Sequence, residues 1–131
     1  MRILIAEDDL TSRLFMTKYM EKFGTCDVAS NGLEAIDNVS EAISLGSNYE
    51  LICLDIMMPK VDGMQALKAI REIEKTNKAL IEPAKVIMTT ALNDKATVEE
   101  AYALGAEAYA WKPIDVDKLK EVIKSLGLIE E

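Results

Sequence analysis

Short, continuously apolar segments alternate with amphipathic segments along this chain, and no other feature restricts the fold as strongly. The apolar segments are residues 3–6, 26–29, 51–54, 85–89 and 108–111. Between and after them, apolar residues recur at helical spacing over 10–23, 33–43, 64–74, 96–104 and 116–126. Because the short segments are continuously apolar, both faces of the sheet they form must be covered. The pattern predicts an α/β fold with a parallel sheet, right-handed crossovers and helices on both faces.

Composition excludes several functions. The 131 residues suit one domain, and a net charge of −8 argues against nucleic acid or an anionic membrane as a partner. The chain has no histidine, which excludes a Ser-His-Asp or Cys-His triad and a phosphohistidine carrier. No apolar segment is long enough to span a membrane. Cys26 and Cys53 are interpreted as reduced, buried thiols of a cytoplasmic protein.

Charged and hydroxyl side chains follow four of the predicted strands, where open α/β sheets bind ligands. They are Glu7, Asp8 and Asp9 after the first strand, Asp55 after the third, Thr89 and Thr90 after the fourth, and Lys112 after the fifth. If the first and third strands are neighbours, carboxylates converge and need a cation between them. Oxygen ligands suit Mg²⁺. Together with a lysine and a hydroxyl, they predict a site for a phosphoryl group.

Each of these residues taken alone has a structural interpretation. Asp8 or Asp9 could cap the next helix, Asp55 could belong to a turn, and Lys112 could be an ordinary surface lysine. Their combination at four strand ends favours a functional site. The glycines never cluster into G-x-G-x-x-G or a P-loop, which argues against a dinucleotide or nucleoside triphosphate site.

The sequence resembles the receiver domain of two-component response regulators from Arg2 to about Leu126. The matching segments are Glu7-Asp8-Asp9, Leu54-Asp55 followed by Met58-Pro59 and Asp62-Gly63, Met88-Thr89-Thr90-Ala91, and Gly105-Ala106 with Tyr109 and Lys112-Pro113. The resemblance implies a flavodoxin-like, doubly wound, five-stranded parallel sheet of order 2-1-3-4-5. It also implies a receiver domain over residues 1–126, a short tail over 127–131 and no output domain.

The resemblance further implies a Mg²⁺-dependent phosphorelay, in which an aspartate takes a phosphoryl group from a partner's phosphohistidine. The implied roles are phosphoacceptor for Asp55, phosphoryl contacts for Thr90 and Lys112, a conformational switch for Thr90 and Tyr109, and Mg²⁺ ligation for Glu7, Asp8, Asp55 and the carbonyl of Met57. Glu7 stands where aspartate is commoner, so a contact through water is expected for it. The chain would catalyse only its own phosphorylation and dephosphorylation. Its partners would be a histidine kinase or histidine phosphotransfer protein upstream and a protein target downstream.

Two other functions stay open, a receiver-like interaction module that is never phosphorylated and a small FMN-binding carrier. The acids after the first strand would repel the phosphate of FMN. Trp111, two residues after Tyr109 on an expected edge strand, also has two interpretations. It either fills the core or belongs to a surface of the last two helices and fifth strand that binds the target or a second copy of the chain.

Overall fold

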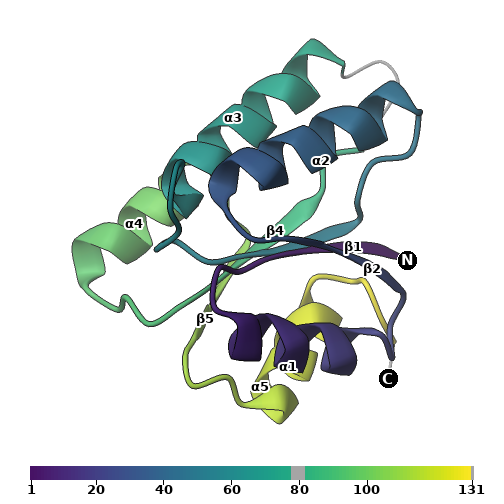
Figure 1. Cartoon of the computed structure of the whole chain (residues 1–131). Helices are drawn as coiled ribbons and strands as arrows, with labels where there is room; N and C mark the ends of the chain where they lie inside the picture. The colour runs from purple at the N-terminus through teal and green to yellow at the C-terminus, as the bar shows by residue number, and fades with distance from the viewer. Residues whose placement is uncertain (78–81, 131) are drawn as a thin grey trace.

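The computed structural model describes residues 1–77 and 82–130, and over these residues five parallel strands form one sheet (Figure 1). They are β1 (Arg2–Ala6), β2 (Thr25–Ala29), β3 (Leu51–Leu54), β4 (Lys85–Thr90) and β5 (Ala108–Trp111). The strand order is β2-β1-β3-β4-β5, which confirms the doubly wound topology. The order reverses between β1 and β3, so the residues that follow these two strands meet at one edge of the sheet.

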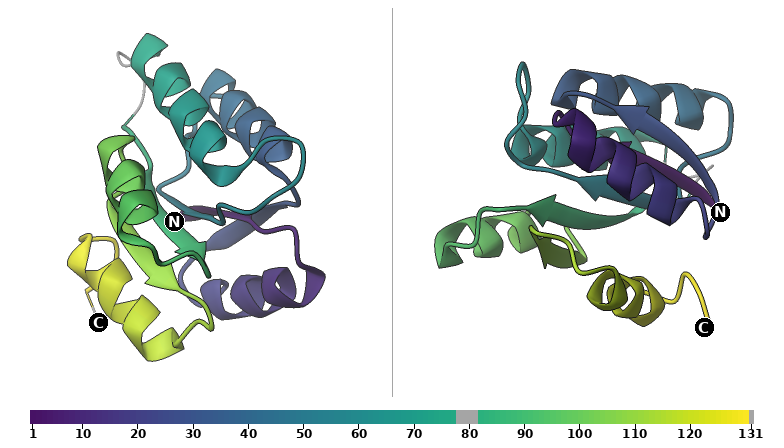
Figure 2. Two further views of the ribbon diagram at one scale, coloured as in Figure 1. Left: turned by 90° about the vertical axis from the view of Figure 1, so that its left-hand side faces the viewer. Right: turned by 60° about the horizontal axis from the view of Figure 1, so that its bottom comes forward.

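A helix follows each strand. The helices are α1 (Leu10–Met20), α2 (Gly32–Ser44), α3 (Gly63–Thr76), α4 (Lys95–Ala103) and α5 (Val116–Ser125). Each begins at an aspartate or asparagine whose side chain accepts a hydrogen bond from an N–H group of the first turn; these caps are Asp9, Asn31, Asp62, Asp94 and Asp115. Figures 1 and 2 show α2 and α3 on one face of the sheet with α4 beside them, and α1 and α5 on the other.

Side chains along each strand alternate between two core layers. Leu4, Ile52 and Val86 pack in the layer beneath α2 and α3. Ile3 and Ile87, their neighbours along the strands, pack in the layer beneath α1 and α5. Both faces of the sheet are therefore covered along β1, β3 and β4. The edge strand β2 contains Asp27 and leaves Val28 47% exposed, so the expectation of a continuously apolar strand is wrong there.

Helix α1 differs from the prediction in its length and in its buried face. It ends at Met20 instead of Phe23, and Met16 and Met20 are its buried residues. Leu10, Leu14 and Phe15 were expected on the buried stripe but are 58%, 61% and 49% exposed. Helical spacing identifies candidate faces, whereas the packing of α1 against the sheet decides which face is covered.

Other predicted boundaries shift by one or two residues, and two expectations need comment. Helix α3 extends to Thr76, two residues beyond the predicted helical range of 64–74, and residues 78–81 between it and β4 lie outside the described residues. Cys53 is buried, but Cys26 is only partly buried; neither forms a disulfide. No helix in the described part of the chain has both the length and the apolar character needed to cross a bilayer.

Candidate functional site

Three carboxylates meet where β1 and β3 end. Asp55 lies beside the end of β1, because its N–H group donates to the carbonyl of Ala6 at 3.0 Å. Ligand atoms of Glu7, Asp8 and Asp55 all lie within 4.8 Å of one another. Glu7 and Asp55 are only 2% and 4% exposed, whereas Asp8 is open to solvent. The topology thus brings together the acids that the sequence placed after two different strands.

Lys112 joins this cluster from the end of β5. Its Nζ donates to Asp55 Oδ2 at 2.9 Å and also to Glu7 Oε1. Burial raises the pKa of the Glu7 carboxyl. Burial alone would lower the pKa of Lys112, but its hydrogen bonds to Glu7 and Asp55 outweigh this effect and raise it. The ammonium group therefore stays charged between two buried carboxylates.

The cluster suits a divalent cation. Lys112 supplies one positive charge against three carboxylates that lie close together, so a net negative charge remains at the site. Among the described residues, no side chain or main-chain group donates a hydrogen bond to the exposed carboxylate of Asp8. Its oxygens are free to bind a hard cation, which prefers oxygen ligands. Met57 offers its N–H to Asp55 Oδ1 at 3.4 Å, and its side chain is 61% exposed beside the cluster.

Arg13 is a second cation at this edge, and it belongs to none of the motifs recognised in the sequence. Its Nη1 donates to the main-chain carbonyl of Glu7 at 2.9 Å. The Oε2 of Glu7 accepts the N–H of Asp9 at 3.0 Å, so the acidic loop is held from both sides. The available signal was the spacing: Arg13 follows the cap Asp9 by one helical turn and therefore faces back toward the loop.

Thr90, Leu92 and Tyr109 form a connected group beside the acidic cluster. Thr90 is fully buried, and its Oγ1 accepts the N–H of Leu92 at 3.5 Å. Tyr109 is 6% exposed, and its hydroxyl donates to the carbonyl of Leu92 at 2.6 Å. Burial raises the pKa of the Tyr109 hydroxyl, which therefore remains a donor. A rotation of Thr90 would therefore break its contact with Leu92, the residue whose carbonyl binds the Tyr109 hydroxyl.

Trp111 does not fill the core. Its side chain is 48% exposed, and its ring centroid lies 5.1 Å from that of Tyr109. Both residues lie on the same face of β5, but Trp111 is the last residue of an edge strand and remains about half exposed. The interpretation of Trp111 as part of a surface therefore remains.

Comparisons with known proteins agree with this geometry. The family described as the response regulator receiver domain matches residues 3–124. Chemotaxis protein CheY of Treponema pallidum (strain Nichols) is 32% identical over 128 residues, which cover 95% of this chain and 81% of that protein. Several histidine kinases also match, but the chain spans only 6% to 15% of their length.

Solved structures share the fold. One is the CheX-CheY-BeF3-Mg²⁺ complex of Borrelia burgdorferi, with a TM-score of 0.83 and 29% identity over 96% of this chain and 88% of that one. Another is the complex of the Saccharomyces cerevisiae histidine phosphotransfer protein Ypd1 with the receiver domain of Ssk1, with a TM-score of 0.81 and 24% identity over 100% of this chain and 93% of that one. The sequence match over residues 3–124, together with the strand order and the acidic edge, shows that the chain belongs to the response regulator receiver domain family.

Proposed function

We propose that this protein accepts a phosphoryl group on Asp55 from the phosphohistidine of a partner protein. The observation that carries the proposal is the contact between Asp55 and Lys112, 2.9 Å long, within a cluster that also contains Glu7 and Asp8. A nucleophilic carboxylate, a cation for the transferred charge and further oxygen ligands are what phosphoryl transfer to an aspartate needs.

The proposed step balances without a further reactant. A carboxylate oxygen of Asp55 attacks the phosphorus, the new O–P bond forms, and the P–N bond to the donor imidazole breaks. The electron pair of that bond stays on the imidazole nitrogen, and Asp55 becomes a mixed anhydride with phosphate. Lys112, already bound to the carboxylate, pairs with the phosphoryl oxygens, and the hydroxyl of Thr90 is their neutral donor.

Mg²⁺ is the cofactor in this proposal. Asp8, Asp55 and the carbonyl of Met57 would hold it directly. Glu7 would bind it through a water molecule, because both oxygens of Glu7 already accept close hydrogen bonds, whereas Oδ1 of Asp55 accepts only the N–H of Met57 at 3.4 Å. When bound, Mg²⁺ neutralises charge on the transferring phosphoryl group. Family membership and the Mg²⁺ complex of the Borrelia burgdorferi CheY support this assignment.

Phosphorylation would act as a conformational switch. The phosphoryl group adds nearly two negative charges and three acceptor oxygens next to Thr90. Thr90 would turn toward it, and Tyr109, whose hydroxyl already binds Leu92, would be held in its buried position. The protein acts on no external substrate in this proposal and catalyses only its own phosphorylation and dephosphorylation.

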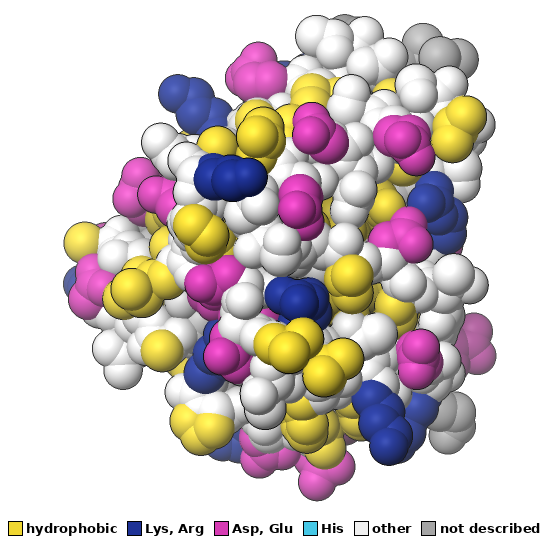
Figure 3. All heavy atoms as spheres, viewed as in Figure 1, with side chains coloured by type: hydrophobic (Ala, Val, Ile, Leu, Met, Phe, Trp, Pro, Cys, Tyr) yellow, Lys and Arg dark blue, Asp and Glu magenta, His cyan; other side chains and the backbone are white. Residues whose placement is uncertain are grey.

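The proposed partners are proteins. A histidine kinase or histidine phosphotransfer protein would supply the phosphoryl group, as the receiver complex with Ypd1 illustrates for another family member. Exposed apolar side chains of α1, namely Leu10, Leu14 and Phe15, lie next to the acidic loop, and hydrophobic side chains gather over α1 in Figure 3. Such a surface suits a protein donor more than a small molecule.

Downstream, the surface around Trp111 would bind a protein target or a second copy of the chain through α4, β5 and α5. Trp111 is exposed beside the proposed switch residue Tyr109, and partly exposed aromatic residues are typical of protein interfaces. We place the protein in the cytoplasm in this proposal because its two cysteines are free.

The two alternative functions fit the site less well. A module that is never phosphorylated would not need a buried aspartate paired with a lysine beside two further acids. An FMN carrier would need a phosphate-binding loop after β1, where this chain has Glu7, Asp8 and Asp9. An absorbance spectrum of the purified protein without flavin bands would exclude the FMN carrier.

The proposal is tested by incubating the protein with acetyl phosphate and Mg²⁺ and measuring its intact mass. We expect one added phosphoryl group on the wild type and none on Asp55→Asn, which keeps the size of the side chain. Chelation of Mg²⁺ by EDTA should prevent the addition. Equal addition to Asp55→Asn would show that the phosphoacceptor is another residue.

A further inference from the structure

Arg13 on α1 lies beside the acidic cluster, and its hydrogen bond goes to the main chain. Its Nη1 donates to the carbonyl oxygen of Glu7 at 2.9 Å. Over residues 1–77 and 82–130, Arg13 forms no ion pair with a carboxylate. An arginine that lies beside three acids and bonds a neutral carbonyl serves the main chain and not charge pairing.

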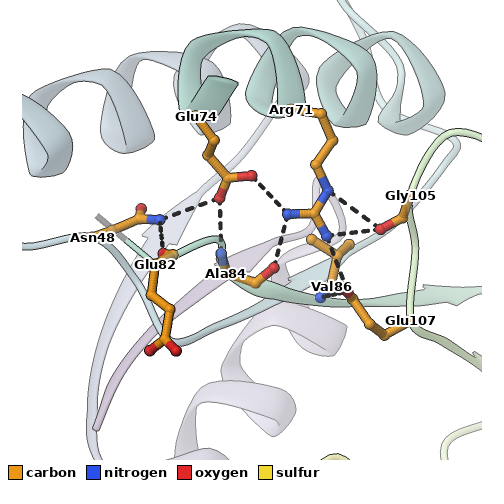
Figure 4. A network of polar contacts seen from close by, with 8 residues as sticks. All are labelled: Asn48, Arg71, Glu74, Glu82, Ala84, Val86, Gly105 and Glu107. Carbon is orange, nitrogen blue, oxygen red and sulfur yellow. Dashed lines mark hydrogen bonds and ion pairs between the residues drawn. The ribbon is translucent and has the colours of Figure 1, made fainter. Parts of the chain in front are cut away.

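Arg71 on α3 shows the other way in which this fold uses a partly buried arginine (Figure 4). Its guanidinium group donates to the carboxylates of Glu74 and Glu107, at 2.7 and 3.0 Å, and to the main-chain carbonyls of Ala84 and Gly105. The carboxylate oxygens that it binds are thereby occupied. If Arg13 paired with Asp8 in the same way, it would occupy oxygens that a hard cation needs.

The carbonyl of Glu7 lies just beyond the last paired residues of β1. The N–H group of Glu7 donates to the carbonyl of Ala29 at 2.9 Å, which extends the ladder between β1 and β2 by one bond. A continued parallel ladder would next pair the Glu7 carbonyl with the N–H of Asn31, but the chain turns there and Asn31 caps α2. Because Glu7 is buried, its carbonyl needs another donor, which Arg13 supplies.

The hydrogen bond from Arg13 also acts on Asp8, because the carbonyl of Glu7 belongs to the peptide unit that joins Glu7 to Asp8. This unit is planar, so a fixed oxygen fixes the direction in which the chain enters Asp8. On the other side of Asp8, the N–H of Asp9 donates to Glu7 Oε2 at 3.0 Å, and the Asp9 side chain caps α1 through the N–H of Ser12. Asp8 is therefore exposed but held between two anchored neighbours.

We infer that Arg13 is a positioning residue for the Mg²⁺ site; this inference rests on the proposed function. It fixes the peptide between Glu7 and Asp8, so that the carboxylate of Asp8 is already placed to bind the metal. Because its hydrogen bond goes to a carbonyl, Arg13 leaves the carboxylate oxygens free. Replacement of a residue that orients a metal ligand typically lowers the affinity for the metal by about tenfold or more.

The charge of Arg13 and its hydrogen bond act on Mg²⁺ in opposite directions. A guanidinium group close to the site repels a divalent cation, so loss of the charge alone would raise the affinity for Mg²⁺. Loss of the hydrogen bond frees the peptide before Asp8, so the affinity should fall, because Asp8 must then be ordered when the metal binds. The sign of the change therefore separates the two effects.

The test is titration calorimetry of the whole protein with magnesium chloride at constant ionic strength. Arg13→Met removes both the charge and the donor and should lower the Mg²⁺ affinity by about tenfold. Arg13→Lys keeps a charge and a donor and should restore the affinity to within about threefold of the wild type. Lys18→Met, at an exposed position on the same helix, is the matched control and should stay within about twofold of the wild type. An unchanged or higher affinity in Arg13→Met, or no recovery in Arg13→Lys, would overturn the inference.

A second measurement needs no metal. In amide hydrogen exchange of the metal-free protein, the N–H of Asp9 should exchange about tenfold faster in Arg13→Met, because the acidic loop has lost one of its hydrogen bonds. Exchange equal to that of the wild type would show that Arg13 does not hold the loop. If Arg13→Met does not fold, Arg13→Gln serves, because its side chain is polar but too short to reach the carbonyl, and the same changes are expected.

Phosphorylation by acetyl phosphate separates this inference from the proposed function. Arg13→Met should need about tenfold more Mg²⁺ for half of the full mass shift and should react like the wild type when Mg²⁺ is saturating. A slower reaction at saturating Mg²⁺ would overturn the positioning role, because Arg13 would then act on the transferred group itself. Absence of a phosphoryl group on the wild type would refute the proposed function, whereas equal Mg²⁺ affinities of the wild type and Arg13→Met would refute only the role of Arg13.

Discussion

The edge of the sheet where the strands begin (the amino edge) and the edge where they end (the carboxyl edge) each carry a partly buried cation among carboxylates. They differ in how completely those groups are paired. At the amino edge, all five donors of Arg71 are used, and Glu74 binds Arg71, the N–H of Ala84 and the amide of Asn48. At the carboxyl edge, Lys112 alone is shared by Glu7 and Asp55, while Asp8 is exposed.

This difference indicates that the amino edge stabilises the fold, whereas the carboxyl edge is suited to bind a cation and to react. At the amino edge the charged groups are paired with one another and with main-chain groups, although Asn48 Oδ1 is buried without a partner among the described residues, and the network serves to fix the elements it joins. An undersaturated cluster costs stability through repulsion between carboxylates, but it retains oxygen atoms that can bind a cation and a nucleophile that can react. Substitutions at the two edges should therefore have opposite signatures.

The largest effect on stability should come from Arg71→Met. The substitution leaves Glu74, which is 3% exposed, without its charged partner, and loss of one member of a buried pair costs about 3–5 kcal/mol. Urea denaturation measures the change, with Lys68→Met on the exposed face of α3 expected to stay within about 0.5 kcal/mol of the wild type. A loss below about 1 kcal/mol for Arg71→Met would show that the amino edge is not the stabilising edge.

Tyr49, also at the amino edge, should make the free energy of unfolding depend on pH in the alkaline range. Burial and a hydrogen bond to Asp27, 2.7 Å long, raise the pKa of Tyr49 above its ordinary value of 10.0. The unfolded chain releases this proton first, so the stabilising contribution is complete below pH 10.0 and is lost as the pH rises further.

The free energy of unfolding should therefore fall above that pH with a contribution from Tyr49 of up to about 1.4 kcal/mol per pH unit. Tyr49→Phe should remove this contribution and cost about 1 kcal/mol at neutral pH for the lost hydrogen bond. Denaturation curves measured from pH 8 to 12 on both proteins check the slope. Parallel curves would contradict the burial of an un-ionised hydroxyl.

At the carboxyl edge, Asp8→Ala should have the opposite sign. Removal of one of three clustered carboxylates relieves repulsion, so the free energy of unfolding should stay the same or rise by about 0.5 kcal/mol. The affinity for Mg²⁺, measured by titration calorimetry, should fall by about tenfold or more. A strongly destabilised variant with unchanged Mg²⁺ affinity would reverse the roles assigned to the two edges.

The smallest expected effect is a spectroscopic one at the end of β5. Trp111 is 48% exposed and its ring contacts that of Tyr109, so stabilisation of Tyr109 in its buried position should change the fluorescence of Trp111. Acetyl phosphate with Mg²⁺ should produce the change in the wild type and leave Asp55→Asn as it was. If the fluorescence of Trp111 did not change on phosphorylation, the proposed coupling between Trp111 and the switch residue Tyr109 would be contradicted.

The sequence predicted most of the fold because the three central strands are buried apolar runs and each helix follows a capping residue. It also placed the acids, Thr90 and Lys112 at one edge, since parallel strands end on the same side of a sheet. The structure brings Glu7, Asp55 and Lys112 into contact, while their chemical roles stay predictions. The exposed apolar side of α1 could not be predicted, because helical periodicity does not say which face meets the sheet.

The amino-edge network could not be predicted from the sequence for a different reason. Arg71, Glu74 and Glu107 look like ordinary charged residues in the sequence, and their pairing depends on main-chain carbonyl and N–H groups of Gly105, Ala84 and Val86 that only the folded chain brings together. The spacing of Arg13 from Asp9 directs its side chain back toward the acidic loop, but its partner there, the main-chain carbonyl of Glu7, could not be identified from the sequence. Motif spacing identifies side chains that share a strand end, but not contacts to the backbone.

The central claim, that Asp55 at the undersaturated edge takes a phosphoryl group from histidine, is tested most directly by transfer from a labelled protein. A histidine phosphotransfer protein carrying radioactive phosphoryl groups is mixed with the wild type or with Asp55→Asn in the presence of Mg²⁺. The label should move to the wild type and stay on the donor when Asp55→Asn is the acceptor, although that variant should fold with unchanged or higher stability. Transfer to Asp55→Asn at the rate of the wild type would contradict the account.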